Sequence, residues 1–528
     1  MRALILTTCL LAGLFVYAQE PNYTWGEPAT NEFQERELEQ LLVLDQEGFV
    51  LLRTHTDKTF VKHYWIEHYN TSMNLVNTFE IPFNVGVMGD SYFLEHVEVA
   101  GGVIYGFVHH WNKAAGKKTL LLKEISLDGE VRDIATLGAI AGQKMGNSGD
   151  FKTHFTPDGS KVVVMSEMPF VKKTKEEFRF TAYSVPEGKE LWSYDHKSKF
   201  DSKKAVNNEF WVNNDGGVLL YKKFWAKPAW QYQVSTYSPN TDWQELDVAF
   251  QGQVEDFWVE IDGIDQFFCF GSYTNKPSAY NRDLNGYIHL SLNKELGLRT
   301  SYIGAWPKNI VAHFSGDRIA DNPEKSKIED FYIRDVIMRS DGLEYIILEQ
   351  ERSDKKPVAG SSPIQYTYQW NYRAPLVICM NPETGEMAWW QTFDKQQEVK
   401  YNLDSDPYGS MVYHMEDDRL FILYNNTPLS VPSIPPANWT ERDGTKYVKH
   451  KAFHDKTMHA TFMHVIEPDG SLAYANRTFG LPLFNFHEGA IFEMSLTTPF
   501  FFSLNGNLVV MASMHNGGKR YRFGMLGL

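Results

Sequence analysis

The sequence predicts an all-β protein, a single β-propeller of about eight four-stranded blades, with seven as the alternative count and the ring closed by the N-terminal segment. Three observations predict this fold. Short β-rich runs are separated by tight-turn residues, a unit of four such runs recurs at roughly 40 to 65 residues, and aromatic residues make up 14% of the 528-residue chain. A sandwich or barrel does not need the same unit so many times, whereas a propeller does.

The clearest copy of the unit lies between residues 151 and 194. A first run at Phe151–Phe155 leads through Pro157-Asp158-Gly159 into a second run at Lys161–Met165. After a polar loop, a third run at Phe178–Val185 and a Pro-Glu-Gly turn lead to a fourth run at Glu190–Tyr194. Proline fixes φ and glycine accepts positive φ, so these triplets are typical of the tight reversals that join antiparallel strands.

The last repeat unit contains three predicted strands instead of four. Tyr23-Thr24-Trp25 supplies a β-prone segment near the other end of the chain, and we expect it to pair beside Tyr521–Leu528 and hide an open edge. Residues Glu32–Leu42 have a helical composition and predict a short helix before the first blade. The eight units begin near Leu41, Phe93, Phe151, Phe210, Phe257, Phe331, Met411 and Phe500.

The N-terminus reads as a secretory signal. Met1-Arg2-Ala3 carries one positive charge, Leu4–Tyr17 is almost purely apolar, and Val16-Tyr17-Ala18 fits a cleavage site. We therefore expect a signal peptide at 1–18, an N-terminal segment with the closing strand at 19–40, and the propeller at 41–528. This signal predicts export from the cytoplasm.

The net charge, the apolar runs and the cysteines narrow the classes of protein to which the chain can belong. A formal net charge of −15 argues against nonspecific nucleic-acid binding and against docking on an anionic membrane. No later apolar run reaches the roughly twenty residues of a membrane-spanning helix. Cys269 and Cys379 remain after the signal, either as one bridge or as two free buried thiols.

Two resemblances support the propeller. The turn Thr156–Lys161 resembles the Pro-Asp-Gly repeats of TolB-like propellers. The stretches Asp330–Asp335, Trp390–Gln397 and Leu420–Asn426 resemble secreted proteins of unknown function from Bacteroidota, over about residues 328 to 528. This likeness implies a bacterial envelope setting and a propeller-like fold, and it implies no activity. With the signal, it implies that the chain is located in the periplasm or at the cell surface of a Gram-negative bacterium.

The sequence contains no catalytic motif, and no catalytic residue or cofactor is predicted. Phosphate-binding loops, the Gly-x-Ser-x-Gly elbow, His-Glu-x-x-His and the calcium loop are all missing. The carboxylate pairs Asp417-Asp418 and Glu349 with Glu351 have the residue type for glycoside hydrolysis, but turn and surface charge is the favoured interpretation. Four histidines are a candidate metal-binding group, but we favour a solvated loop as the interpretation of this stretch: His450, His454, His459 and His464. The adjacent His109 and His110 would point to opposite faces of a strand and cannot chelate together.

Long loops define a candidate binding face. In a blade, the connection between the second and third strands emerges on the same face as the link to the next blade. The long insertions fall in these two classes, at 111–117, 171–176, 224–230, 273–284, 351–372 and 426–457, with a blade link at 305–327. Long loops on a rigid scaffold concentrate binding residues, although their aromatics also pack loops onto blades. The predicted ligand-binding residues are Trp111, Trp225, Trp230, Tyr280, Trp306, Tyr366, Tyr368, Trp370 and Trp439.

These features predict a noncatalytic interaction protein of the bacterial cell envelope. Its expected partner is an envelope protein, such as a component of an outer-membrane complex, bound through the long-loop face, and the chain is expected to be monomeric outside such a complex. The alternative is a glycan-binding or glycan-degrading propeller, which aromatic platforms and scattered carboxylates suggest.

Overall fold

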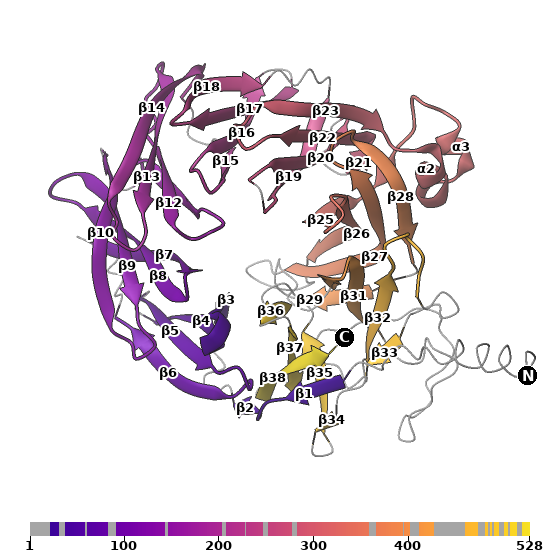
Figure 1. The fold of residues 1–528 in the computed structure, drawn as a ribbon, viewed down its shortest axis with the longest axis horizontal. Coiled ribbons are helices and arrows are strands. Elements are labelled where there is room, and N and C mark those ends of the chain that lie inside the picture. Colours follow the sequence, from indigo (N-terminus) through magenta and orange to yellow (C-terminus); the bar gives the residue numbers. More distant parts are fainter. Residues whose placement is uncertain are drawn as a thin grey trace, which may run out of the picture.

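The strands form eight antiparallel sheets arranged as blades around a central opening, as Figure 1 shows for the computed structural model of the chain. This arrangement confirms the predicted all-β propeller and its count of eight. The structure describes residues 22–30, 37–58, 61–82, 91–142, 146–202, 207–226, 229–246, 252–263, 265–276, 282–357, 366–393, 395, 397–401, 411–426, 460–473, 481–483, 486–487, 490–495, 501–504, 507–514 and 520–527.

Blades 1 to 4 each consist of four consecutive strands, numbered from the central opening to the rim. Blade 1 has β3 (Glu37–Val43), β4 (Phe49–Thr56), β5 (Lys62–Tyr69) and β6 (Leu75–Ile81); blade 2 has β7 (Ser91–Ala100), β8 (Val103–Asn112), β9 (Lys117–Ile125) and β10 (Val131–Ala141); blade 3 has β11 (Asp150–Phe155), β12 (Lys161–Glu167), β13 (Lys175–Ser184) and β14 (Glu190–Asp201); blade 4 has β15 (Asn207–Val212), β16 (Val218–Ala226), β17 (Ala229–Ser238) and β18 (Thr241–Leu246).

Blades 5 to 7 carry the insertions. Blade 5 has β19 (Gln253–Ile261), β20 (Phe267–Thr274), β22 (Gly286–Leu292) and β23 (Leu298–Ala305); blade 6 has β25 (Phe331–Met338), β26 (Glu344–Pro357), β27 (Tyr366–Asn381) and β28 (Glu386–Thr392), with β29 (Gln397–Tyr401) added to β27; blade 7 has β30 (Val412–Glu416), β31 (Arg419–Asn426), β32 (Ala460–Ile466) and β33 (Leu481–Leu483). Between blades 5 and 6, a two-stranded sheet pairs β21 (Asp283–Leu284) with β24 (Ile328–Glu329).

The N-terminal segment closes the ring. Blade 8 contains β35 (Ala490–Ser495) and β36 (Phe501–Leu504), both paired to β37 (Asn507–Met514), and then β38 (Arg520–Gly527). β34 (Phe486–His487) extends β35. On the free side of β38 lie β1 (Asn22–Trp25) and β2 (Ala29–Thr30), with Tyr23 opposite Leu526 and Trp25 opposite Gly524. The predicted closure is therefore confirmed.

The turns follow the chemistry read from the sequence. In the turn after β11, Gly159 adopts φ +68°, which glycine tolerates without a Cβ clash. The Asp158 carboxylate accepts hydrogen bonds from the Thr156 hydroxyl at 2.6 Å and the Ser160 backbone N–H at 3.0 Å. Local side-chain bonding of this kind fixes the hairpin and therefore the register of the two strands.

Two segments differ from the sequence-based expectation. Residues 37–43, part of the segment expected to be helical, form strand β3, because Gln40–Val43 pair with Phe49–Leu52 and Leu42 joins the blade core. Pairing within a packed sheet overrides the local helical preference. The link expected at 305–327 contains helices α2 (Lys308–Ser315) and α3 (Asp317–Ala320) at the rim (Figure 1).

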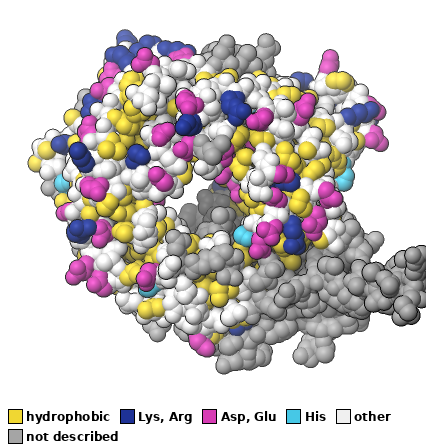
Figure 2. Space-filling model, viewed as in Figure 1, with side chains coloured by type: hydrophobic (Ala, Val, Ile, Leu, Met, Phe, Trp, Pro, Cys, Tyr) yellow, Lys and Arg dark blue, Asp and Glu magenta, His cyan; other side chains and the backbone are white. Residues whose placement is uncertain are grey.

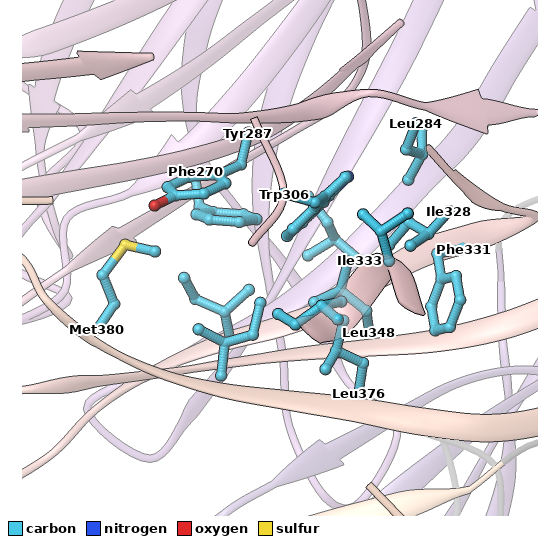
Figure 3. Packing of buried hydrophobic residues seen from close by; sticks show 14 of the residues in the cluster. Phe270, Leu284, Tyr287, Trp306, Ile328, Phe331, Ile333, Leu348, Leu376 and Met380 are labelled. Atoms are coloured by element: carbon cyan, nitrogen blue, oxygen red, sulfur yellow. The ribbon is translucent and has the colours of Figure 1, made fainter. Parts of the chain in front are cut away.

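Among the described residues, the largest apolar cluster lies between blades 5 and 6, where α2 and the blade link pack onto the sheets. Figure 3 shows Trp306 among Phe270, Tyr287 and Ile333 of this cluster. Cys269 and Cys379 lie in the cores of other inter-blade layers and are free and buried, which decides between the two states left open by the sequence. No helix in the described part of the chain is long and apolar enough to cross a membrane.

Candidate functional site

A three-stranded sheet projects beyond blade 6 on the long-loop face. β26 and β27 pair within the blade up to Glu349 opposite Pro375 and, after a bulge, continue for seven more residue pairs, from Glu351 opposite Tyr372 to Pro357 opposite Tyr366. β29 pairs along the other side of β27, at residues 368–372. We call residues 351–357, 366–372 and 397–401 the projecting sheet. Figure 1 shows β29 beside the central opening.

A buried ion-pair network anchors the projecting sheet at its base. The Glu349 side chain is fully buried and contacts the buried Lys395 ammonium and the Arg334 guanidinium, which lies 2.8 Å away. Arg334 also reaches the Glu351 carboxylate at 2.5 Å. Burial lowers the pKa of Lys395, and the Glu349 carboxylate opposes that effect. Removing one partner of such a buried pair is strongly destabilising, so the network stabilises the base of the projecting sheet.

This network also gives the Glu349 and Glu351 pair its role. Both carboxylates share the guanidinium of Arg334, and neither is presented as a reactive pair to a substrate. The second predicted pair forms an inter-blade contact, because Asp418 accepts hydrogen bonds from the Ser340 backbone N–H at 2.7 Å and the Ser340 hydroxyl at 2.5 Å. The structural interpretation of both pairs is the one the geometry supports.

Aromatic and cationic groups extend the network along the sheet. The Lys395 ammonium lies 5.4 Å from the centre of the Tyr372 ring, and Trp370 lies nearly parallel to Tyr372 with ring centres 6.5 Å apart. At the outer end, the Lys355 ammonium lies 4.1 Å from the centre of the Tyr366 ring, which is 39% exposed. Tyr372 and Lys395 are buried, so the exposed part of this row is its outer end, where Tyr366 and Lys355 lie.

The neighbouring blade is tied to the same region through Arg282. Its guanidinium donates to the Phe331 carbonyl at 2.8 Å, contacts the Asp256 carboxylate, and lies 4.1 Å from the centre of the Tyr332 ring. Such cation–π contacts contribute about 0.5 to 2 kcal/mol. Blades 5 and 6 are therefore locked together beneath the projecting sheet.

The wall of the central opening carries carboxylates close to an exposed tryptophan. Figure 2 shows the hollow at the middle of the ring, with acidic and basic side chains gathered at one side of it. On β19, Trp258 is 36% exposed. Burial and the neighbouring Asp335 and Glu344 raise the pKa of Glu260 to about 7, and burial raises the pKa of Asp335 to about 6. Burial therefore brings the pKa values of these two carboxyl groups on the innermost strands toward neutral pH.

The structure divides the predicted ligand-binding residues into groups. Trp111 and Trp306 are 6% and 3% exposed, so neither ring is presented to solvent, and Trp306 packs in the apolar cluster between blades 5 and 6. Trp225 lies opposite Trp230 near the end of the β16–β17 hairpin, and Tyr368 lies opposite both Lys355 and Tyr401. Tyr366 and Trp370 belong to the projecting sheet, whereas Tyr280 and Trp439 lie outside the described residues.

The histidines of the metal candidate do not form a described site. His464 is 2% exposed, stacks 3.9 Å from Phe393, and burial lowers its pKa to about 4. His450, His454 and His459 lie outside the described residues. His110 stacks on Tyr92 while His109 packs near Phe151, so these two rings do face different neighbours. Within the described ranges, no three His, Cys, Asp or Glu side chains are arranged to hold a metal ion.

Sequence reasoning missed the residues that anchor the site. Arg334, Arg282 and Lys395 are single charges within apolar or polar runs, and their partners lie on other strands or other blades. One signal was present, because Arg334 and Asp335 interrupt an otherwise apolar first strand, and buried charges must be paired.

The comparisons with known proteins find only distant structural similarities. No protein-family model matches the chain, and no curated protein matches it significantly. Among solved structures, the chain is similar to the Dos1 propeller, at 9% identity and a TM-score of 0.41 over 95% of each chain. It is also similar to the β-propeller domain of the Trilobed protease from Pyrococcus furiosus, at 8% identity and a TM-score of 0.32 over 71% of this chain and 94% of that chain. A third is an exo-β-1,3-galactanase from Phanerochaete chrysosporium, at 11% identity and a TM-score of 0.24 over 65% and 77%. Such values carry no argument about activity.

Proposed function

We propose that this chain is a noncatalytic interaction protein of the bacterial cell envelope that binds a protein partner through its long-loop face. The observation that carries the proposal is the projecting sheet, which continues seven residue pairs beyond the blade and gains a third strand there. This extension is not needed to complete blade 6, which already has four strands. A rigid sheet that presents aromatic and cationic groups is suited to a protein interface, where tyrosine, tryptophan and arginine are enriched.

Site-specific photocrosslinking in intact cells tests this proposal. A photoreactive phenylalanine replaces Tyr366 in the projecting sheet and, as the control, Leu298 at the start of β23. The two side chains are 39% and 38% exposed, but β23 begins at the short-turn face, opposite the long loops. The proposal expects a protein adduct of one defined mass from position 366 and none from position 298. The same adducts from both positions, or none from position 366, would contradict it.

A glycan-binding channel is the second candidate. Trp258 is exposed beside the central opening, and Glu260 follows on the same strand. An aromatic face beside carboxylates is a combination that recognises sugar rings. An oligosaccharide array probed with the native protein and with the Trp258→Ala variant distinguishes the two functions. Binding that disappears in the variant would favour the channel, whereas silence across plant, algal and microbial glycans would remove this candidate.

A further inference from the structure

The outermost strand of blade 3 is longer than its counterparts. β14 has 12 residues, whereas the outermost strands of blades 1, 2, 4, 5 and 6 have between 6 and 11. Figure 1 shows β14 on the outer rim of the ring. Among the described residues, β13 pairs with one side of β14 and no strand pairs with its other side. The backbone groups of this free edge are therefore able to pair with another strand.

Ion pairs cross from β13 to β14 on the exposed face of the sheet. Arg179 Nε lies 2.6 Å from Asp195 Oδ1, and Lys197 Nζ lies 2.7 Å from Glu177 Oε1, with all four side chains at least 48% exposed. The two pairs have opposite order, because β14 supplies the carboxylate of one and the cation of the other. Asp195 and Lys197 are two residues apart, so they lie on the same face of β14.

The other face of β14 packs against blade 4. Tyr194 stacks on Tyr237 with ring centres 4.0 Å apart, and His196 stacks on Trp243 with ring centres 3.9 Å apart. Over residues 192–197, the register of β14 with β13 is regular. The free edge is therefore ordered before any partner arrives, which lowers the entropic cost of pairing.

The charges of β14 are complementary to those of a second β14. When a strand pairs antiparallel with its own copy about a two-fold axis, residues equally far before and after the axis lie opposite each other. With His196 on the axis, Asp195 of each copy lies opposite Lys197 of the other. The signs of charge then alternate along the row from Arg179 of one copy to Glu177 of the other. Burial lowers the pKa of His196, so the two imidazoles on the axis are neutral at pH 7.

Other registers and other outermost strands lack this match. An axis on Asp195 or on Lys197 would bring like charges face to face, which destabilises a strand pair. A two-fold axis on a residue pairs positions that are an even number of residues apart. Among the described outermost strands of blades 1, 2, 4, 5 and 6, none has opposite charges at such a spacing. Charges on an edge strand usually prevent pairing, but those of β14 favour one specific partner.

We propose that a second copy of this chain pairs with the free edge of β14, so that two blade 3 sheets join in a symmetric dimer with His196 on the axis. The proposal goes beyond the binding function and does not depend on it, because the contact lies on blade 3 and the projecting sheet belongs to blade 6. The two β14 strands run in opposite directions. The long-loop faces of the two copies therefore point in opposite directions, and both stay free.

Sedimentation velocity of the full chain over a series of concentrations tests the proposal. The native chain should show a monomer–dimer equilibrium. Asp195→Lys and Lys197→Asp each place like charges opposite each other at two symmetry-related positions, so each should weaken dimerisation by at least about tenfold. The matched control Asp133→Lys reverses an exposed charge on β10 that also pairs across two strands, and it should leave dimerisation unchanged. A native chain that sediments as a monomer at every concentration would overturn the proposal.

The double variant separates a lost contact from a folding defect. Combining Asp195→Lys with Lys197→Asp breaks both ion pairs within the chain but restores opposite charges across the two-fold axis. Dimerisation should therefore return to the level of the native chain, while the melting temperature stays no higher than those of the single variants. A double variant that dimerises no better than the single variants would equally overturn the proposal.

Discussion

The closing strand can be dislodged by a single added methyl group. A Cβ built on Gly524 of β38 would lie 2.5 Å from Cε3 of Trp25, well inside contact distance. Trp25 packs under the Arg522 guanidinium at 4.3 Å, and the next residue, Gly26, donates its N–H to the Phe523 carbonyl at 2.9 Å. The Gly524→Ala substitution must therefore displace the tryptophan or bend β38 away from β1.

The size of the effect follows from the cost of overpacking. Inserting a methyl group into a filled site costs about 1 to 3 kcal/mol. A loss of about 2 kcal/mol in the local opening free energy corresponds to roughly 30-fold faster amide exchange, since about 1.4 kcal/mol is a factor of ten. Hydrogen exchange measured by mass spectrometry should show this increase in peptides covering residues 520–527.

Gly263→Ala is the matched control. A Cβ at Gly263 meets no heavy atom within 4 Å, and the residue has no positive φ. Its peptides and those of β38 should exchange as in the native chain. Exchange of β38 within twofold of native in Gly524→Ala would refute the reasoning that β1 is clamped onto blade 8.

Three further predictions concern buried groups. Lys395→Met should lower the free energy of unfolding by about 3 kcal/mol, since it leaves Glu349 buried with one cation fewer. The control Lys175→Met, which removes an exposed pair with Asp201, should cost under about 0.5 kcal/mol. Equal urea midpoints for the two variants would contradict the role of Lys395 as an anchor of the projecting sheet. Cys269 and Cys379 should resist a thiol reagent in the native chain and react after unfolding. The reason is that burial raises both thiol pKa values, that of Cys379 to about 11. Rapid labelling of the native chain would contradict this prediction, because it would show that a thiol is accessible. Burial lowers the pKa of His464 to about 4, so its contribution to stability is present above pH 6.5 and is lost toward pH 4, at a cost of about 3 kcal/mol. In denaturation curves at pH 4.5 and 7, His464→Phe should lose less stability at the lower pH than the native chain does. An equal loss of stability in the variant would contradict this role of His464.

The blade pattern was predictable because its signals are local. Pro-Asp-Gly and related turns fix hairpins through residues adjacent in sequence. Of the eight expected unit starts, six fall within the first strand of a blade, one immediately precedes β30, and one immediately precedes β36, which follows β35 in blade 8. The closing strand was predictable from an inventory of strands and the need to cover an open edge. Both arguments require no knowledge of contacts between distant residues.

The site was less predictable because its contacts are not local. A bulge between Glu349 and Glu351 turns both carboxylates toward Arg334, and Lys395 arrives from the link after β28. Neither the bulge nor the contact between Lys395 and Glu349 can be predicted from a sequence pattern. Trp111 and Trp306 were expected at a surface because they border long insertions, but loop boundaries do not reveal on which side of a blade a ring packs. The helix expected before blade 1 illustrates the same limit, since pairing with β4 decided its conformation.

The affinity of the partner captured at position 366 is the most direct test of the proposed binding face. It is measured with purified native chain, Tyr366→Ala and Leu298→Ala, at one pH and one salt concentration. An interface centred on the projecting sheet predicts a loss of at least about tenfold in affinity for Tyr366→Ala, as for an interface hot spot, with no change for Leu298→Ala. Equal affinities of all three proteins would contradict the assignment of the projecting sheet as the contact.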